Sequence, residues 1–410
     1  MFRPVSENEG TKGTEGIGER GRGAAARTPN RRWVRAVGYT LGGVLVIAAV
    51  GGGWVYRHLD GNIRSVDIDA ALGDDRPHAP VGMPMESAGP SQGPAEGGGA
   101  LNILLLGSDS RDGEENRRLG GGSPGSARAD TAMVVHLAEG RTSATVVSIP
   151  RDTLVTRPAC PLPDGGTTAA AQGVMFNSAY AVGGPVCAVK TVEALSGVPM
   201  DHYLEVDFAG FANLVDALGG VTVELAEPID DDLSHLHVDA GVHHLYGEDA
   251  LALARTRHGV GDGSDLGRIG LQQQLVRALL EQVERADLLA DPVRLYQVAD
   301  AATSGLTADT GLDSLEELAG LARSLSGLTP EAVRTVTLPV VPAPFDRNRV
   351  VPEEPEAGEL WASLLPGAPA VVPEPSGSGV SASATASATV TRPPSVPGAP
   401  SVSGPQPLPQ

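Results

Sequence analysis

The sequence predicts an α/β fold in which helices cover both faces of a mixed β-sheet. Apolar runs at 101–107, 131–137 and 144–150 have the length and composition of strands. The first is apolar throughout, as expected for a strand covered on both faces. Segment 266–288 instead repeats apolar residues every four positions, which indicates an amphipathic helix. Such mixing of strands and helices is typical of layered α/β domains.

The other elements follow from local signals in chain order. The glycine turn in 138–143 predicts that the strands at 131–137 and 144–150 form a hairpin. The segment 185–197 begins at a proline and ends at a glycine, as helices often do. Further helices are predicted at 175–182, 208–220 and 312–325, and further strands at 201–208, 221–225 and 333–340.

Composition separates a folded region from its flanks. We expect a disordered cytoplasmic N-terminus over 1–35, an extracytoplasmic linker over 57–99 and a disordered tail rich in Ser, Pro and Gly over 366–410. One folded domain of roughly 250 residues remains, from about 100 to 350, and a single core can support it.

An uncharged segment predicts that the chain is anchored in the cell membrane. Residues 36–55 carry no charge, and about 20 helical residues span ~30 Å, one hydrocarbon thickness. Arginines precede the segment and Trp33 and Trp54 flank it, so we predict a single span over 36–56 with its N-terminus cytoplasmic. The alternative is a cleaved signal peptide, for which the segment is long.

Charge and cysteine content limit the possible partners. Of the 410 residues, 50 are acidic and 30 are Lys or Arg, giving a formal net charge of -20, which argues against a nucleic-acid partner. The two cysteines, Cys160 and Cys187, match no zinc motif. They could form one bridge if the domain lies outside the cell, and buried free thiols are the alternative.

Three charged motifs should meet at one end of the sheet. Asp109 follows the strand at 101–107, Asp130 precedes the strand at 131–137, and Arg151 and Asp152 follow the strand at 144–150. If these neighbouring strands are antiparallel, all three motifs lie at the same edge. The connection from Arg111 to Arg128 is long and rich in glycine, and such loops are often functional.

The segment 253–275 adds arginines to this acidic chain. Arg255 and Arg257 share a side only if the backbone there is extended. Arg268 and Gln272 lie on one face of a helix that Asp265 could cap. Arginines beside two carboxylates suggest a Mg²⁺-bound pyrophosphate, because Mg²⁺ prefers carboxylate and phosphate oxygens and arginine forks onto phosphate.

Several of these residues also have ordinary structural interpretations. Asn177 could simply begin a helix, Gln272 could be exposed, and Asp152 could pair with a neighbouring arginine. Zinc binding is disfavoured because the histidines lack a matched carboxylate or cysteine pattern. The histidines in question are His235, His237, His243 and His244.

Taken in order, the motifs resemble those of the LytR-CpsA-Psr family over about 100–284. They include "LLLGSDSR", "RADTAMVV", "SIPRDT", "FNSAY", "VDFAGFANLVDALGGVTVEL", "GVHHLYGEDALALARTR" and "DLGRIGLQQQ". Members of this family are membrane-anchored phosphotransferases that attach glycopolymers to the cell wall. The resemblance implies a three-layer α/β/α sandwich around a mixed sheet, of the actinobacterial type that often carries a cysteine pair, which supports a Cys160–Cys187 bridge.

The resemblance also implies roles for particular residues. Asp109 and Asp130 would hold Mg²⁺ (or Mn²⁺), and Asp152 and Asp109 are candidates for the general base. Leu271 departs from the family, which often has an arginine there, and puts one peripheral contact in doubt. The expected catalytic arginines are Arg151, Arg255, Arg257 and Arg268, and the expected substrate-binding residues are Arg111, Arg128, Asn177, Asp265 and Gln272.

The implied reaction transfers a glycan phosphate from a polyprenyl-pyrophosphate carrier to a sugar hydroxyl of peptidoglycan. The apolar helices could line a groove for the lipid. Two alternatives are a polyprenyl-pyrophosphate phosphatase, in which water replaces the acceptor, and a regulator that binds the lipid phosphate without turnover.

Overall fold

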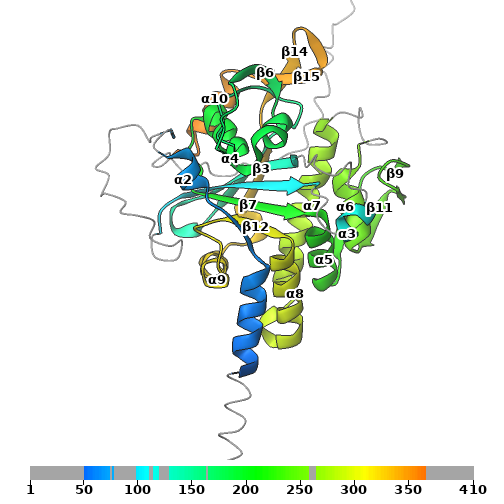
Figure 1. The fold of residues 1–410 in the computed structure, drawn as a ribbon. Helices are drawn as coiled ribbons and strands as arrows, with labels where there is room; N and C mark the ends of the chain where they lie inside the picture. Colours follow the sequence, from blue (N-terminus) through cyan, green and yellow to red (C-terminus); the bar gives the residue numbers. More distant parts are fainter. Residues whose placement is uncertain are drawn as a thin grey trace, which may run out of the picture. The chain divides into compact units, whose positions relative to one another are not determined.

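The fold is built around a seven-stranded mixed sheet (Figure 1). The computed structural model describes residues 50–73, 76–77, 98–109, 114–119, 129–162, 165–257 and 265–365. The strand order is β1-β12-β7-β2-β3-β4-β13. These strands are β1 Arg64–Val66, β2 Leu101–Ser108, β3 Ala129–Leu137, β4 Ala144–Ser148, β7 His202–Asp207, β12 Leu306–Asp309 and β13 Val333–Thr337.

The pairing at the centre of the sheet confirms the predicted mixed topology. Strand β3 pairs antiparallel with both β2 and β4, which gives the expected hairpin. Strand β7 lies parallel to β2, and β13 lies parallel to β4. The ends of β2 and β4 therefore meet the start of β3 at one edge, where the charged motifs were expected.

Apolar clusters cover both faces of this sheet. Leu104 and Leu106 of β2 are fully buried in the cluster that contains Val189 of α4 (Asn177–Ser196). Ile103, which points to the opposite face of β2, is buried with Leu321 of α9 (Leu315–Ser324). Helices therefore cover both faces, as the sequence predicted.

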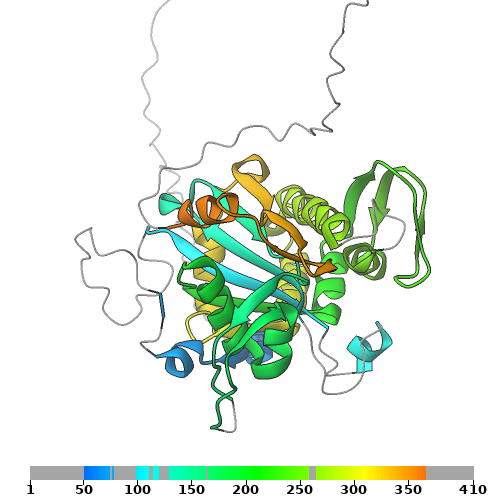
Figure 2. The same cartoon turned by 90° about the horizontal axis from the view of Figure 1, so that it is seen from above.

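A second apolar cluster lies beside the sheet. It joins the helices α5 (Phe208–Ala217), α6 (Gly247–Arg255) and α7 (Asp265–Arg285) to two hairpins. The views in Figures 1 and 2 both place these hairpins at one side of the sheet, next to α6. The hairpins pair β8 (Val221–Leu225) with β11 (Gly241–Leu245), and β9 (Ile229–Asp231) with β10 (Leu236–Val238).

The folded unit begins earlier than the expected boundary at 100. Strand β1 joins the edge of the sheet beside β12, and α2 (Ile68–Leu72) buries Ile68 and Leu72 in the main core. These residues lie within 57–99, which was predicted to be a linker, and for them that prediction is wrong. The prediction missed them because three strand residues and five helix residues are too few to show a period.

At the other end the fold also exceeds the expected boundary at 350. Helix α10 (Glu356–Ala362) buries Trp361 in the main core, and Leu364 beyond it is also buried. The hairpin of β14 (Val340–Ala343) and β15 (Asp346–Pro352) precedes α10. The expected tail over 366–410 lies outside the described residues, as does the expected N-terminal segment 1–35.

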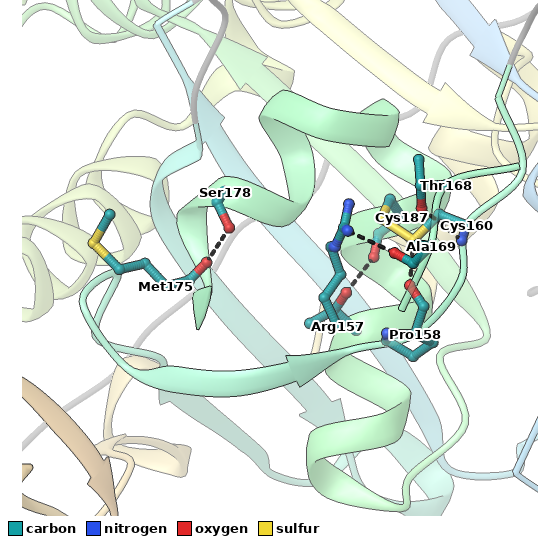
Figure 3. The surroundings of a disulfide bond; sticks show 9 residues. Arg157, Pro158, Cys160, Thr168, Ala169, Met175, Ser178 and Cys187 are labelled. Atoms are coloured by element: carbon teal, nitrogen blue, oxygen red, sulfur yellow. Dashed lines mark hydrogen bonds between the residues drawn. A yellow bond between two sulfur atoms is a disulfide. The ribbon is translucent and has the colours of Figure 1, made fainter. Parts of the chain in front are cut away.

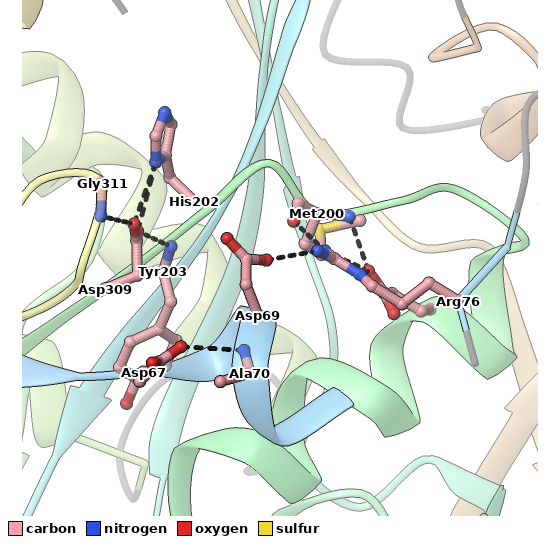
Figure 4. Close-up of polar contacts among 10 residues, drawn as sticks. Asp67, Asp69, Ala70, Arg76, Met200, His202, Tyr203, Asp309 and Gly311 are labelled. Carbon is pink, nitrogen blue, oxygen red and sulfur yellow. Dashed lines mark hydrogen bonds and ion pairs between the residues drawn. The ribbon is translucent and has the colours of Figure 1, made fainter. Parts of the chain in front are cut away.

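A polar cluster around Arg76 joins α2 to α4, and a second one around Asp309 joins β12 to β7. Figure 4 shows Arg76 reaching back to Asp69 of α2 and to the carbonyl of Met200. Arg76 also pairs with the buried Glu193 of α4 at 2.7 Å. In the same figure Asp309 accepts the backbone N–H of Tyr203 at 2.7 Å and lies 3.2 Å from His202.

The segment expected to cross the membrane lies mostly outside the described residues, which include only its last seven positions. Residues 50–62 form a helix. Among the helices of the described ranges, none has both the length and the apolar character of a membrane span.

A disulfide bridge joins Cys160 to Cys187 of α4, with their Cα atoms 5.2 Å apart (Figure 3). Both cysteines are fully buried. The two helices predicted at 175–182 and 185–197 form the single element α4, interrupted by non-helical backbone at Gly183 and Gly184. A Cβ on Gly183 would lie 2.7 Å from the Cβ of Cys187, so glycine makes room for the bridge.

Candidate active site

The predicted carboxylates lie at the ends of adjacent strands. Ser108 of β2 pairs with Ala129 of β3 beyond an irregularity in the register. Asp109 comes directly after the end of β2, and Asp130 is the extra residue of β3 between the pairs Ser108–Ala129 and Gly107–Thr131. Antiparallel pairing therefore brings Asp109 and Asp130 to the same edge, as the hairpin argument predicted.

Arg151 reaches the same edge from the end of β4. Its Nη1 donates to Oδ1 of Asp130 at 3.0 Å. Its backbone N–H donates to Oδ2 of Asp265 at 3.1 Å, and its Nε lies 3.6 Å from Oδ1 of that carboxylate. Arg151 thus links the sheet to the first residue of α7.

Arg268 is the most buried arginine of the site, with 3% of its surface exposed. Its Nη2 lies 2.5 Å from Oδ1 of Asp265 and donates to the carbonyl of Asp130 at 3.0 Å. Burial lowers the pKa of Arg268, and the Asp265 carboxylate opposes that shift. The carboxylate of Asp265 therefore holds both Arg151 and Arg268.

Among the described residues, two buried N–H groups and one buried carboxylate oxygen of this cluster, Oδ1 of Asp265, form no hydrogen bond. Within the described part of the chain, Nε of Arg151 and Nε of Arg268 have no hydrogen-bond acceptor although both atoms are buried. A buried donor without a partner is costly. A phosphate oxygen is the kind of acceptor that would satisfy an arginine there.

Arg255 and Arg257 come together as predicted, through an extended residue between them. Arg255 ends α6, and Thr256 has φ -58° and ψ 134°, so the chain leaves the helix extended. Both arginines line the cavity described below. The guanidinium of Arg255 lies 4.8 Å from the ring centre of Phe208 and donates to the carbonyl of Leu119 at 2.6 Å.

Gln272 is buried rather than exposed. Its Nε2 donates to Oγ1 of Thr131 and to the carbonyl of Ala254, both at 2.9 Å. It thereby joins α7 to β3 and to the end of α6. The neighbouring Leu271 packs in the second apolar cluster, so the departure from the family lies in the core.

Asp152 and Asn177 lie beside the cluster but do not line the cavity. Asp152 stands between Arg151 at 3.7 Å and Arg349 of β15 at 3.4 Å, which agrees with the ion-pair interpretation. The backbone N–H of Asn177 donates to the carbonyl of Arg151 at 3.3 Å. The predicted residues Arg111 and Arg128 lie outside the described residues.

The charged cluster borders a cavity of about 460 Å³ between the sheet and helices α5, α6 and α7. Its charged lining residues are Asp130, Asp207, Asp231, Arg255, Arg257 and Arg268. The remaining wall is mostly apolar and includes Leu105, Met133, Phe208, Phe211, Leu275 and Leu279. The volume lies within the range of sites for small ligands and cofactors.

Sequence reasoning missed two acidic residues of this site. Asp231 is buried, lines the cavity and accepts the backbone N–H of Arg257 at 3.1 Å. Asp207 also lines the cavity and caps α5 through the N–H of Gly210. Asp207 was visible as a cap signal before a helix, whereas Asp231 lies in a short hairpin with no motif.

A buried tyrosine and glutamate pair lies behind Asp109. Tyr180 of α4 donates to the carboxylate of Glu205 at 2.8 and 2.9 Å. Burial and the Glu205 charge raise the pKa of Tyr180 well above its usual value, and Asp109 adds to this effect. Tyr180 therefore stays protonated at neutral pH, and its neutral hydroxyl can donate or accept hydrogen bonds.

Two residues of the site could serve as ligands to a magnesium ion. Asp109 and Asp130 offer two carboxylates at one edge, and Mg²⁺ commonly takes one or two carboxylates plus substrate phosphates. Within the described ranges, no group of three His, Cys, Asp or Glu side chains could enclose a metal ion alone. A cation here would therefore depend on the substrate for further ligands.

Fold and site together define an α/β domain with arginine and aspartate side chains at a mostly apolar cavity. The sequence model described as the LytR_cpsA_psr family matches residues 55–364. The chain belongs to this family. The match begins before residue 100, in agreement with the folded unit seen here.

Curated relatives include proteins of cell-wall assembly. The chain is 37% identical over 270 residues to "Probable cell wall biosynthesis protein LcpB" of Corynebacterium glutamicum, covering 64% of this chain and 60% of that protein. It is 32% identical over 240 residues to "Polyisoprenyl-teichoic acid--peptidoglycan teichoic acid transferase TagU" of Bacillus mycoides, covering 58% and 69%. The match thus spans less than two thirds of the Corynebacterium protein.

A solved structure shares the fold. The "LytR-Csp2A-Psr enzyme from Actinomyces oris" superposes with a TM-score of 0.52 at 25% identity, covering 74% of this chain and 96% of that chain. The relatives reported above are named as a cell-wall biosynthesis protein and as a transferase of teichoic acid to peptidoglycan.

Proposed function

We propose that this protein is a membrane-anchored phosphotransferase that moves a glycan phosphate from a polyprenyl-pyrophosphate carrier to a hydroxyl of peptidoglycan. One observation carries the proposal: three arginines, Arg255, Arg257 and Arg268, line a mostly apolar cavity. A diphosphate with an isoprenoid tail needs both at once. Relatives named as transferases of teichoic acid from a polyisoprenyl carrier to peptidoglycan support a lipid-linked donor and this acceptor.

The arginines act on the diphosphate by position and charge. Arg255, Arg257 and Arg268 line the cavity, where their guanidinium groups can bind phosphate oxygens. Charge that develops on the phosphoryl oxygens is stabilised by donors already fixed in a site of low dielectric. Asp265 keeps two of these arginines in place before substrate binds.

The reaction breaks one bond and forms one. The acceptor hydroxyl oxygen attacks the phosphorus that carries the glycan, the bond to the bridging oxygen breaks, and polyprenyl phosphate leaves. The hydroxyl proton passes to a carboxylate. The two predicted bases are Asp109 and Asp152; Asp152 is held between two arginines, and neither side chain lines the cavity.

We also propose that Asp109 and Asp130 hold Mg²⁺ or Mn²⁺ with the substrate. The ion would supply charge neutralisation for the diphosphate. Asp130 already contacts Arg151, so the same carboxylate would orient an arginine and bind the ion. In this proposal the catalytic domain works on the outer side of the cell membrane.

Transfer can be tested with the full chain in detergent, Mg²⁺, a short polyprenyl-pyrophosphate-linked glycan and peptidoglycan oligomers. Mass spectrometry should detect a phosphodiester-linked product, and Arg255→Ala should abolish it while the protein stays folded. Arg277→Ala, on the exposed face of α7, serves as the matched control and should transfer normally.

The same assay separates the alternatives. Release of free glycan phosphate with no linked product would indicate a phosphatase, and lipid binding with neither product would indicate a regulator. Transfer by Arg255→Ala at the wild-type rate would show that the site is assigned wrongly.

A further inference from the structure

The β9–β10 hairpin, which lies beside α6 in Figure 1, carries three consecutive aspartates with very different exposure. The side chains of Asp230 and Asp232 are 88% and 97% exposed, whereas Asp231 is 2% exposed and lines the cavity. Burying an ionised carboxylate is costly unless the group is paired or hydrogen-bonded. The contacts of Asp231 therefore indicate why a carboxylate is buried at this position.

The two carboxylate oxygens of Asp231 accept different backbone N–H groups. Oδ1 accepts from Leu233 at 3.0 Å, within the hairpin, and Oδ2 accepts from Arg257 at 3.1 Å, beyond the end of α6. The N–H of Thr256 still bonds to carbonyls of α6, so Arg257 is the first residue after that helix whose N–H leaves it. Asp231 thus fixes the direction in which the chain leaves α6.

A second contact anchors the residue between the two arginines. Thr256 is fully buried, and its hydroxyl donates to the carbonyl of Ala252 at 2.9 Å. Its Oγ1 also lies 2.7 Å from Oγ of Ser234, and because the Thr256 proton is already used, Ser234 is the donor. Neighbouring side chains of an extended chain point to opposite sides. Thr256 is directed at the hairpin, so Arg255 and Arg257 point away from it, and both line the cavity.

We propose that Asp231 and Ser234 are positioning residues, which hold Arg255 and Arg257 in place to bind a diphosphate. The hairpin acts on the backbone of Arg257 and on the side chain of Thr256, and the two arginine side chains contact the ligand. This inference rests on the proposed function, because it needs a diphosphate at these arginines, and it adds the β9–β10 hairpin to the site.

The charge of Asp231 taken alone opposes the binding of an anion. Three carboxylates and three guanidinium groups line the cavity, so their formal charges cancel. Removing one carboxylate makes the cavity more positive, which on charge alone should strengthen diphosphate binding. Asparagine, however, offers one acceptor oxygen, and its amide nitrogen would face a second backbone N–H. Asp231→Asn therefore loses one of the two hydrogen bonds, and the positioning role predicts weaker binding where charge alone predicts stronger binding.

Calorimetric titration of the full chain with farnesyl diphosphate, in detergent with Mg²⁺, tests the direction of this change. Asp231→Asn should weaken binding about tenfold, the effect of losing one hydrogen bond to a charged group. Ser234→Ala should weaken it by a smaller factor. Asp232→Asn removes the same charge from an exposed side chain and should bind as the wild type does. Unchanged or tighter binding by Asp231→Asn would overturn the inference.

A double-variant cycle separates positioning from a general loss of structure. If Asp231 acts through Arg257, then Asp231→Asn should weaken binding by only about threefold or less in a chain that already carries Arg257→Ala. Thermal melting of each variant confirms that it is folded. The same tenfold loss in both backgrounds would show that Asp231 has a merely structural role and would overturn the inference.

Hydrogen exchange tests the contact between the hairpin and α6 without any ligand. The backbone amide of Arg257 should exchange about tenfold faster in Asp231→Asn than in the wild type, because its acceptor is lost, and Asp232→Asn should leave the rate unchanged. If the wild-type chain binds no farnesyl diphosphate, the proposed function and the ligand named here both fail. If the wild type binds it and the exchange rate at Arg257 does not change in Asp231→Asn, only the positioning role fails.

Discussion

At the scale of single residues, the site depends on buried arginine. Arg268 uses its planar guanidinium to contact the Asp265 carboxylate and the Asp130 carbonyl together while its Nε remains without an acceptor among the described residues. A lysine offers one ammonium and no rigid fork. The side chain therefore orients other groups and still offers a donor to an anion.

We predict that Arg268→Lys lowers transfer by about 100-fold, the loss expected when one fixed donor to a developing anion is removed. Arg277→Lys, on the same helix with a side chain 65% exposed, should transfer normally. Steady-state rates of both variants in detergent, with thermal melting to confirm folding, make the comparison. Equal rates would show that the guanidinium geometry of Arg268 has no catalytic role.

A residue outside the site should make stability depend on pH. Burial lowers the pKa of His136 below its usual 6.5, with Arg141 adding to the effect, and its Nδ1 lies 2.7 Å from Oδ1 of Asn102. The unfolded chain therefore binds the proton more readily than the folded one. The free energy of unfolding should fall as pH drops through about 6.5 and level off below the folded pKa.

His136→Gln should lose less stability than wild type when pH is lowered from about 7.5 to 5.5. Urea unfolding at several pH values measures the slope. A variant at exposed His235 controls for the loss of an imidazole elsewhere. Parallel curves for wild type and His136→Gln would contradict the prediction.

At the scale of elements, α5 is held between two helical segments by glycines. A Cβ on Gly210 would lie 2.5 Å from the Cα of Gly305 after α8 (Pro292–Ser304), and a Cβ on Gly247 at the start of α6 would lie 2.3 Å from the carbonyl oxygen of Ala212. Backbone atoms cannot move aside as flexible side chains can. The close approach also fixes Phe208 and Phe211, which line the cavity.

Gly210→Ala should therefore destabilise the protein by roughly 1–3 kcal/mol, because overpacking pushes α5 away from Gly305. Binding of a polyprenyl phosphate should weaken with it, since the cavity wall moves. Gly270→Ala on α7, where nothing lies within 4 Å of the new Cβ, is the control and should fold normally. Urea midpoints and lipid titrations compare the two variants.

The disulfide is a second constraint between elements. It joins residues 27 positions apart, and closing a loop of this length contributes about 3–4 kcal/mol in the chain-entropy model. The double variant Cys160→Ala with Cys187→Ala should lose about that much. Reductant should lower the urea midpoint of wild type and leave that of the double variant unchanged; a reductant effect on both would contradict this prediction.

The elements predicted from sequence were those with long apolar runs or clear periods. Strands β2, β3 and β4 and helix α7 each carry such a pattern. Strand β12 and helices α6 and α8 were missed. Strand β12 has four residues and α6 has nine, and the apolar positions of α8 are mostly exposed or half-buried. Tertiary contacts rather than local pattern define these elements.

At the scale of the whole molecule, the site joins segments that sequence reasoning could bring together only in part. Hairpin topology was enough to place Asp109, Asp130 and Arg151 at one edge. The approach of Arg268 to that edge depends on how α7 crosses the sheet, which no local pattern encodes. The resemblance to the family supplied that link, and the roles of these residues remain predictions.

The folded unit as a whole needs chain that lies before residue 100. Ile68 and Leu72 are 0% and 5% exposed in the main core, and Arg76 pairs with Glu193, which is 2% exposed. Loss of two large apolar side chains costs about 3–6 kcal/mol, and an unpaired buried Glu193 adds about 3 kcal/mol. The sum is comparable to the total stability of a typical domain, about 5–15 kcal/mol.

A fragment covering 100–365 should therefore aggregate or unfold at 25 °C, whereas a fragment covering 57–365 should unfold cooperatively. Circular dichroism and size-exclusion chromatography of the two fragments make the test. In the longer fragment, Arg76→Ala leaves the buried Glu193 carboxylate without its partner. The double variant Arg76→Ala with Glu193→Gln has no such carboxylate, so it should lose less stability than Arg76→Ala alone. If 100–365 folds with the stability of 57–365, then β1, α2 and Arg76 are accessory, and the boundary expected from composition is the correct one.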